Sequence, residues 1–407
     1  MTCRHCNHPL TNAFCDLQTC PPSNAMVKLD AVTSPETYFP LKVFVCEKCW
    51  LVQVDELEKA EAIFNDEYTY FSSYSTSWLQ HAKEYAEYMS ERFGYNGQSL
   101  VVEIASNDGY LLQYFKEKNI PVLGVEPTAN TAQVAIEKGI ENIIDFFGSN
   151  LAESRLKAKA DLILGNNVLA HVPDINDFVK GVKISLKPNG VNTFEFPHLC
   201  KLVEYNQFDT IYHEHFSYLS LTAVKAIFEA QGLEIFDVQE LPTHGGSLRI
   251  FAKHQADNTK QIEPTVQALL EKEHQLGVST LSYYTGFQEK VDKIKYDFTS
   301  FLIAQKAAGK KVIGYGAAAK GNTLLNYCGI KGHDLISFVV DASPYKQNKL
   351  LPGSRIPVVG KEQIAAYEPD YVIIFPWNLK TEITEQLSFI RQWGGQFVVA
   401  IPELQIF

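Results

Sequence analysis

Short apolar runs alternate with amphipathic stretches through the middle of the chain. Residues 78–93 place apolar side chains at positions 79, 82, 85, 86 and 89, a spacing that predicts an amphipathic helix. Short apolar runs that predict buried strands occur at 100–104, 122–126, 161–165 and 190–195. The segment 186–190, Leu-Lys-Pro-Asn-Gly, is typical of a turn before the last of these strands. This rhythm predicts a parallel, doubly wound sheet of the α/β class.

The last third of the chain begins with a long helical region and ends in a second strand–helix alternation. Apolar side chains recur there at spacings of four and three, which predicts one packed helical stripe. The stripe consists of Phe287, Val291, Ile294, Phe298 and Phe301. Apolar runs that begin at residues 312, 338 and 371 then predict the strands of a second Rossmann-like α/β unit.

The composition narrows the class of protein. The chain has 407 residues, 46% of them hydrophobic, which is enough for two or three packed domains. Its net charge of −11 argues against a nucleic-acid-binding surface. No apolar run approaches the roughly 20 residues that span a bilayer, and the N-terminus lacks an apolar signal region. We therefore expect a cytoplasmic protein without a membrane partner.

Two close cysteine pairs stand near the N-terminus, Cys3-x-x-Cys6 and Cys46-x-x-Cys49. In the cytosol such cysteines are thiols or metal ligands rather than disulfides. Two Cys-x-x-Cys turns complete a tetrahedron of thiolates, which predicts a structural zinc site with no position open for catalysis. Four reduced thiols in a small core are the alternative to zinc. The remaining candidates for ligands are Cys15, Cys20, His5 and His8.

Three parts are therefore expected along the chain. Residues 1–66 form a small zinc-binding module. Residues 67–254 form the central doubly wound Rossmann-like domain. Residues 255–407 form a second Rossmann-like α/β domain with a helical lead-in.

A strand–helix–strand unit near residue 100 predicts a cofactor site. Its first strand contains Glu103 and runs into the turn 105–109, Ala-Ser-Asn-Asp-Gly, and its second strand ends in Glu126. In such units the second acid bonds ribose hydroxyls. The turn lacks the phosphate-binding G-x-G-x-x-G pattern, so it suits a positively charged nucleoside without phosphate, such as S-adenosylmethionine (SAM). His171 follows the third strand, although position alone also fits an ordinary loop histidine.

The segment 208–218 carries the densest set of groups that exchange protons near neutral pH. It contains Tyr212, His213, Glu214 and His215 between apolar residues. This mixture predicts acid–base chemistry in a poorly solvated cleft. An amphipathic turn that happens to contain two histidines is the alternative.

Two glycine-containing turns predict ligand contacts further along. The turn that begins at His244 has two glycines and is followed by Arg249, which suits an anion, although a hairpin turn explains the glycines equally. The loop Gly314-Tyr-Gly316 leads into a helix, as in dinucleotide sites, but Ala319 stands where the third glycine would be. The diphosphate of a nucleotide sugar would use the same backbone amides.

Taken together, these motifs resemble the three-domain, SAM-dependent sugar C-methyltransferases that act on nucleotide-linked deoxyketosugars, of the tetronitrose-pathway type. The resemblance covers essentially the whole chain. It runs through Cys3-x-x-Cys6, Cys46-x-x-Cys49, Tyr68-Thr-Tyr70, Asn107-Asp-Gly109, His171-Val-Pro173, Glu214-His-Phe216, His244-Gly-Gly246, Gly314-Tyr-Gly-Ala317 and Lys346-Gln-Asn348. One departure is Ala105, because the SAM turn of this family usually begins with glycine.

The resemblance implies roles for particular residues. The first four cysteines would bind zinc, and the C-terminal domain would help to hold a nucleotide sugar, most readily a TDP-sugar. The expected catalytic residues are Tyr70, His171, Tyr212, Glu214 and His215. The expected SAM-binding residues are Glu103, Ala105, Asn107, Asp108, Gly109, Glu126, Asn166 and Asn167. The expected substrate-binding residues are His244, Gly245, Gly246, Arg249, Tyr315, Lys320, Lys346 and Asn348.

The expected reaction is methylation at C3 of a 4-ketosugar by a monomeric enzyme. His215 would remove the C3 proton, Glu214 or a tyrosine would orient it, and His171 or Tyr212 would bond the enolate oxygen. Two alternatives are carried forward. One is an NAD-dependent nucleotide-sugar dehydrogenase or epimerase that uses the loop at 314–316 and Asp341. The other is a non-catalytic zinc-ribbon adaptor.

Overall fold

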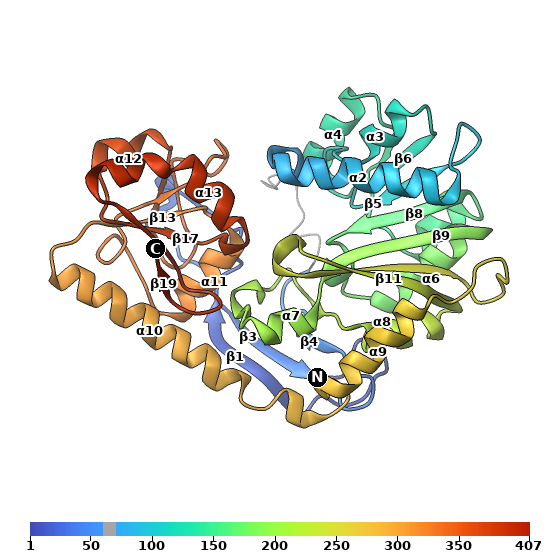
Figure 1. The fold of residues 1–407 in the computed structure, drawn as a ribbon, viewed down its shortest axis with the longest axis horizontal. Coiled ribbons are helices and arrows are strands. Elements are labelled where there is room, and N and C mark those ends of the chain that lie inside the picture. Colours follow the sequence, from blue (N-terminus) through green and yellow to red (C-terminus); the bar gives the residue numbers. More distant parts are fainter. Residues whose placement is uncertain (60–70) are drawn as a thin grey trace.

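The computed structural model describes residues 1–59 and 71–407, which are arranged around three β-sheets (Figure 1). The first is a four-stranded antiparallel sheet near the N-terminus, in the order β1-β3-β4-β10. Its strands are β1 (Asn12–Cys20), β3 (Phe39–Val45), β4 (Val52–Val54) and β10 (Ser217–Tyr218).

The second sheet confirms the doubly wound central domain. Its order is β11-β12-β9-β8-β5-β6-β7, parallel from β9 to β7, with β12 antiparallel to both of its neighbours. Its strands are β5 (Val101–Ile104), β6 (Val122–Val125), β7 (Asn142–Ile143), β8 (Ala160–Asn166), β9 (Leu186–Pro197), β11 (Leu233–Leu241) and β12 (Ser247–His254). Its helices are α2 (Thr76–Phe93), α3 (Leu112–Glu117), α4 (Ala129–Glu137), α5 (Ser149–Leu151), α6 (Ile175–Ser185), α7 (Leu199–Glu204) and α8 (Leu221–Ala230).

Helices cover both faces of this sheet because neighbouring strand residues point in opposite directions. Val101 packs with residues of α2 and α3, whereas Val102 packs with residues of α6 and α8. Both valines are fully buried. A run of apolar residues without alternation, as the sequence has at 100–104, is what such a strand requires.

The expected turn at residues 186–190 is wrong. These residues belong to β9, and the ladder to β8 pairs Ala160 with Leu186 and then Leu162 with Val191. Three extra residues on β9 are therefore accommodated as an irregularity within the strand. Proline, asparagine and glycine serve this bulge as readily as they serve a turn.

The third sheet forms the C-terminal Rossmann-like unit, in the order β19-β18-β17-β13-β14-β16-β15-β2. Its strands are β2 (Val27–Lys28), β13 (Val312–Tyr315), β14 (Val339–Val340), β15 (Lys349–Leu350), β16 (Pro357–Val359), β17 (Tyr371–Ile374), β18 (Gln396–Val399) and β19 (Gln405–Ile406). Its helices, with the lead-in, are α9 (Pro264–Leu276), α10 (Phe287–Ala307), α11 (Ala319–Tyr327), α12 (Glu362–Tyr367) and α13 (Lys380–Gln386). The predicted apolar stripe of α10 is buried along its whole length.

The three parts exchange strands, so the N-terminal module joins the other two. β2 of the N-terminal module pairs with β15 of the C-terminal sheet, and β10 of the central part pairs with β4. β1 also packs on α10, where the rings of Phe14 and Phe287 stack with centroids 4.5 Å apart. Figure 1 shows the central domain on one side and the C-terminal domain on the other, with β1 and β3 at the lower centre and α10 beneath the C-terminal domain. In the described parts of the chain, no helix has the length and apolar character needed to cross a membrane.

The four predicted cysteines come together in the N-terminal module. The sulfur atoms of Cys3, Cys6, Cys46 and Cys49 all lie within 4.8 Å of one another, with Cys3–Cys49 at 3.5 Å and Cys6–Cys46 at 3.6 Å. A tetrahedron with zinc–sulfur bonds of about 2.3 Å has sulfur–sulfur edges of about 3.8 Å. The donor set therefore fits zinc.

The other candidate ligands lie elsewhere. Cys15 and Cys20 belong to β1 and are buried in the apolar core. His5 is hydrogen-bonded to Asn176, at 2.8 Å, and His8 is paired with Glu47, at 3.1 Å. Because these side chains have other partners, the two Cys-x-x-Cys pairs alone make up the tetrahedron.

Replacement of one ligand should release the metal and loosen the module. We expect the wild-type protein to carry one zinc ion per chain and Cys46→Ser to lose it, with a clear fall in the midpoint of thermal unfolding, because a structural zinc site contributes folding energy directly. Elemental analysis and thermal denaturation would measure both effects. His8→Ala is the matched control and should keep its zinc; loss of zinc from the control would overturn the ligand assignment.

Candidate functional site

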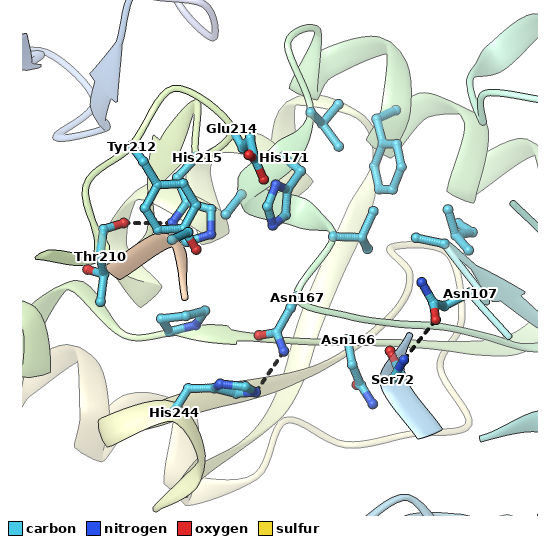
Figure 2. Close-up of a pocket in the computed structure, with 18 of the residues that line it drawn as sticks. Ser72, Asn107, Asn166, Asn167, His171, Thr210, Tyr212, Glu214, His215 and His244 are labelled. Carbon is cyan, nitrogen blue, oxygen red and sulfur yellow. Dashed lines mark hydrogen bonds between the residues drawn. The ribbon is translucent and has the colours of Figure 1, made fainter. Parts of the chain in front are cut away.

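A cleft of about 1440 Å³ lies between the central and C-terminal domains and is lined by residues from all three parts of the chain (Figure 2). Four of the five predicted catalytic residues line it, together with five of the eight predicted cofactor residues. The predicted site residues that line the cleft are Ala105, Asn107, Glu126, Asn166, Asn167, His171, Tyr212, Glu214, His215, His244, Lys320 and Lys346. Tyr70 lies outside the described residues.

The remaining predicted residues do not line the cleft. They are Glu103, Asp108, Gly109, Gly245, Gly246, Arg249, Tyr315 and Asn348. Several of them have structural roles that the residue type alone does not distinguish from ligand binding.

The turn after β5 is held in a fixed shape beside the cleft. Ala105 and Asn107 both have left-handed backbones, with φ of 57° and 50°. The amide of Asn107 donates to the Glu126 carboxylate at 2.9 Å, and the amide of Ser72 donates to the Asn107 side chain at 2.9 Å (Figure 2). Glu126 also accepts from the amide of Thr128, at 2.9 Å. The acid at the end of β6 therefore shapes the cofactor turn and reaches the cleft as well.

The structure shows how the turn accommodates Ala105 at a position where glycine is usual in the family. A left-handed backbone costs an alanine about 1–2 kcal/mol, whereas glycine adopts it freely. The surrounding turn holds Ala105 in this conformation, and its methyl group faces the cleft lining. The chain therefore keeps the shape of the turn despite the extra carbon.

Glu103 precedes the turn, Asp108 and Gly109 belong to it, and all three have structural roles there. Glu103 is fully buried in β5, and burial raises its pKa well above the usual value. Asp108 accepts hydrogen bonds from the hydroxyl and the amide of Ser73, the latter at 3.3 Å, and so ties the segment after residue 70 to the turn. A Cβ on Gly109 would lie 2.6 Å from Ile140, which explains the glycine by packing.

Aromatic residues that the sequence analysis did not select complete this end of the cleft. Phe146 and Phe147 follow β7, and Trp78 of α2 and Tyr110 from the segment before α3 line the cleft as well. Phe146 is 38% exposed, which is unusual for so large an apolar side chain. The available signal was its place directly after the end of a strand, where α/β sheets hold their ligands.

The histidines at the centre of the cleft are close together and uncharged. His215 lies beside Tyr212, with ring centroids 4.0 Å apart, and beside His171, with centroids 4.6 Å apart (Figure 2). Burial lowers the pKa of His171 to about 4. Burial, and then the neighbouring His171, lower the pKa of His215 well below 6.5.

A single hydrogen bond fixes which nitrogen of His215 carries the proton. Its Nδ1 lies 2.8 Å from the carbonyl oxygen of Thr210. A carbonyl only accepts, so Nδ1 carries the hydrogen and Nε2 of the neutral ring keeps its lone pair. An imidazole in this form is a ready proton acceptor.

Glu214 is held by a residue from the N-terminal module. The amide nitrogen of the Asn24 side chain donates to both carboxylate oxygens, at 2.7 and 2.9 Å. Burial raises the pKa of Glu214 to about 7 in spite of this contact. His213, between the two, points away: its Nε2 donates to the carbonyl of Pro40 at 3.2 Å, and the residue does not line the cleft.

The turn at residue 244 is a hairpin connection between β11 and β12, which is the alternative that the two glycines allowed. His244 nevertheless lines the cleft. His244 accepts from the side chain of Asn167 at 3.0 Å (Figure 2). A Cβ on Gly245 would lie 2.4 Å from Trp377, so packing requires that glycine. Arg249 is buried and paired with Glu195 at 2.6 Å, which occupies the guanidinium expected to meet an anion.

The second glycine loop is filled by side chains of the protein itself. Cβ atoms on Gly314 and Gly316 would lie 2.5 Å from Phe375 and Pro376 respectively. Asp341, at the end of β14, accepts from the amide of Ala317 at 2.7 Å. Tyr315 is buried in the core of this domain, and Lys320 and Lys346 are the predicted residues here that line the cleft.

Comparison with known proteins agrees with this geometry along the whole chain. Three family models match, described as "Putative zinc binding domain" over residues 3–64, "Methyltransferase domain" over 77–238 and "C-methyltransferase C-terminal domain" over 242–402. The C-methyltransferase NovU of Streptomyces niveus is 36% identical over 406 residues, 99% of this chain and 96% of that protein.

Among solved structures, a SAM-dependent methyltransferase from Clostridium acetobutylicum is 11% identical and covers 43% of this chain and 92% of its own, with a TM-score of 0.35. The 1,6-didemethyltoxoflavin-N1-methyltransferase of Burkholderia thailandensis is 16% identical and covers 50% and 94%, with a TM-score of 0.37. The full-length relative, together with the three consecutive family models, settles the question: the chain belongs to the family of three-domain, SAM-dependent C-methyltransferases.

Proposed function

We propose that this protein transfers the methyl group of SAM to C3 of a nucleotide-linked 4-keto-deoxysugar, most readily a TDP-sugar, by way of an enolate. The observation that carries the proposal is His215: a neutral imidazole with its Nε2 lone pair available, in a cleft that continues to the turn at 105–109. Carbon is a poor nucleophile until a proton is removed, so a C-methyltransferase needs such a base.

The residues around the turn fit SAM. Glu126 stands at the end of the second strand, where it would accept from ribose hydroxyls, and Phe146 offers a flat apolar face for adenine. Asn107 and Asn166 line the cleft between them and offer side-chain amides to the amino-acid part of the molecule. When bound there, SAM supplies an electrophilic methyl group on a sulfonium and leaves as neutral S-adenosylhomocysteine with the electron pair of the broken carbon–sulfur bond.

His215 would act first. The C–H at C3 is acidic because the adjacent C4 carbonyl can hold the charge, and Nε2 of His215 takes that proton. General-base help of this kind is worth about 10²–10⁴-fold. The Thr210 carbonyl, by holding Nδ1–H, also stabilises the imidazolium that forms. The enolate carbon then forms the new carbon–carbon bond, and the proton on His215 later passes to solvent.

The neighbours of His215 would stabilise the enolate and the imidazolium that form when the proton is removed. His171 and Tyr212 flank the ring of His215, and either would donate to the enolate oxygen. Glu214 as a carboxylate would favour the imidazolium form of its neighbour, and Asn24 orients that carboxylate. Tyr70 is proposed as a further catalytic residue from the resemblance alone.

The alternatives have weaker support. Phe375 and Pro376 crowd the second glycine loop, and Asp341 is engaged by a backbone amide of that loop, which leaves a dinucleotide little of its usual site. An adaptor without activity would have no use for a 1440 Å³ cleft lined by three uncharged histidines.

The proposal predicts both the cofactor and the product. Calorimetric titration should show binding of SAM and no binding of NAD. Incubation of the enzyme and SAM with a panel of nucleotide-linked 4-ketosugars should give a product heavier by one methylene in mass spectrometry. Because C5 also flanks the ketone, carbon NMR must locate the new methyl group. Binding of NAD without SAM, or no methylated product from any 4-ketosugar, would contradict the proposal.

Removal of the base should stop the reaction but spare the cofactor. His215→Gln should lower kcat by at least about 10²-fold, the low end of the contribution of a general base, while the affinity for SAM changes little. Steady-state kinetics and calorimetry measure the two. His213→Gln is the matched control, since that neighbouring histidine faces away from the cleft, and it should keep its turnover. Near-normal turnover of His215→Gln would mean that another group is the base.

The pH dependence should report Glu214 rather than His215. Burial raises the pKa of Glu214 to about 7, so its carboxylate, and with it kcat/KM, should increase as the pH rises through about 7. His215 has a lowered pKa and stays neutral across that range. In Glu214→Gln the inflection near pH 7 should disappear and the overall rate should be lower. An unchanged inflection in this variant would assign it to another group.

A further inference from the structure

A lysine that forms no direct ion pair with another described residue lies in the wall of the cleft that the C-terminal domain contributes. Lys320 is in the first turn of α11, is partly buried and lines the cleft. Among the ion pairs between described residues, none involves Lys320. We propose that Lys320 is a catalytic residue whose ammonium group stabilises the enolate formed next to the ketone. This inference rests on the proposed function and adds to it a role for the C-terminal domain in the chemistry itself.

The ammonium group is held in place by uncharged groups. Nζ donates to the side-chain oxygen of Asn378 at 2.9 Å and lies 4.3 Å from the centroid of the Trp377 ring. The indole nitrogen of Trp377 donates to the buried carboxylate of Asp209 at 2.7 Å, which fixes the ring. Neither the aromatic face nor the amide neutralises the cation. The carboxylate of Asp209 acts on Lys320 electrostatically and favours its charged form, without a direct ion pair between these described residues.

The position of Lys320 points to the reacting carbon rather than to a remote phosphate. Its charge acts on both His215 and His244, whose pKa values it helps to lower, although burial is the larger cause for each. A group that perturbs the proposed base also lies near the carbon from which that base takes a proton. Burial lowers the pKa of Lys320 itself to about 8, which still leaves it mostly charged at neutral pH.

The second lysine of this wall provides a contrast. Nζ of Lys346 donates to the carbonyl of Ala317 at 2.9 Å and lies 4.0 Å from the carboxylate of Asp341. Lys346 is thus partly neutralised and stands at the glycine loop, where a diphosphate would be expected. Lys320 has no direct ion pair among the described residues, and its charge helps to lower the pKa values of both His215 and His244.

The C-terminal domain also holds, by hydrogen bonds, the turn whose Thr210 carbonyl orients His215. The hydroxyl of Thr323 in α11 donates to the carbonyl of Ile211 at 2.9 Å, one residue after the Thr210 carbonyl that binds His215. Asp209, on the other side of Thr210, is bound by Trp377. Helix α11 therefore carries Lys320 and also holds the turn that contains the Thr210 carbonyl. The ammonium group and the proposed base are thereby kept at a fixed separation.

Exchange of the substrate hydrogen with solvent tests this role apart from methyl transfer. The wild-type enzyme with S-adenosylhomocysteine and a nucleotide 4-ketosugar in deuterium oxide should incorporate deuterium next to the ketone. Lys320→Met should slow that incorporation and lower kcat by about 10²–10³-fold, the loss typical of one charge-stabilising donor, with KM nearly unchanged. Lys346→Met is the matched comparison and should mainly raise KM, with a smaller effect on exchange.

The outcomes distinguish a failure of the inference from a failure of the proposed function. A wild-type exchange rate in Lys320→Met, whether or not KM rises, would overturn the inference and leave the proposed function standing. Absence of exchange in the wild type with every 4-ketosugar would overturn the proposed function and the inference with it. Binding of S-adenosylhomocysteine by calorimetry shows that the variant is folded. If Lys320→Met fails that check, Lys320→Gln, which keeps a donor to Asn378 but no charge, takes its place with the same expected loss.

Discussion

The proposed chemistry of this protein depends on one hydrogen bond, from Nδ1 of His215 to the carbonyl of Thr210. The bond selects the tautomer whose free nitrogen can accept a proton, and burial keeps the ring neutral so that the nitrogen is available. In the proposed reaction, other features of the cleft orient this ring or stabilise the charge that proton removal creates. Tyr212 and His171 flank it, and the C-terminal domain holds the turn from which the carbonyl projects.

The three parts of the chain share strands. This explains how residues from all three keep fixed positions in one cleft. Arg4 illustrates the coupling: its backbone amide is bonded to Gln53, whose side chain contacts the sulfur of Cys3, and its guanidinium donates to the carbonyl of Pro173 at 2.9 Å. Pro173 follows the turn that carries His171. The cysteine cluster is therefore linked through a short chain of contacts to the loop that carries His171.

Much of the fold and part of the site could be predicted from the sequence because local patterns determine them. The non-alternating run at 100–104 had to be a strand buried on both faces, and two Cys-x-x-Cys turns had to converge. Asn24 and Trp377 were missed because their partners, Glu214 and Asp209, are 190 and 168 residues away in the chain. No local spacing reveals such contacts.

Other predicted residues show the limit of residue type as a guide. Arg249 and Gly245 have the chemistry of an anion site, yet the arginine is buried against Glu195 and the glycine makes room for Trp377. The pattern gives the identity of a side chain but not the direction in which it points. Nitrogen NMR of histidine-labelled protein at pH 6 tests the central claim most directly. The account predicts that His215 is neutral there with its proton on Nδ1. A charged ring, or a proton on Nε2, would contradict it.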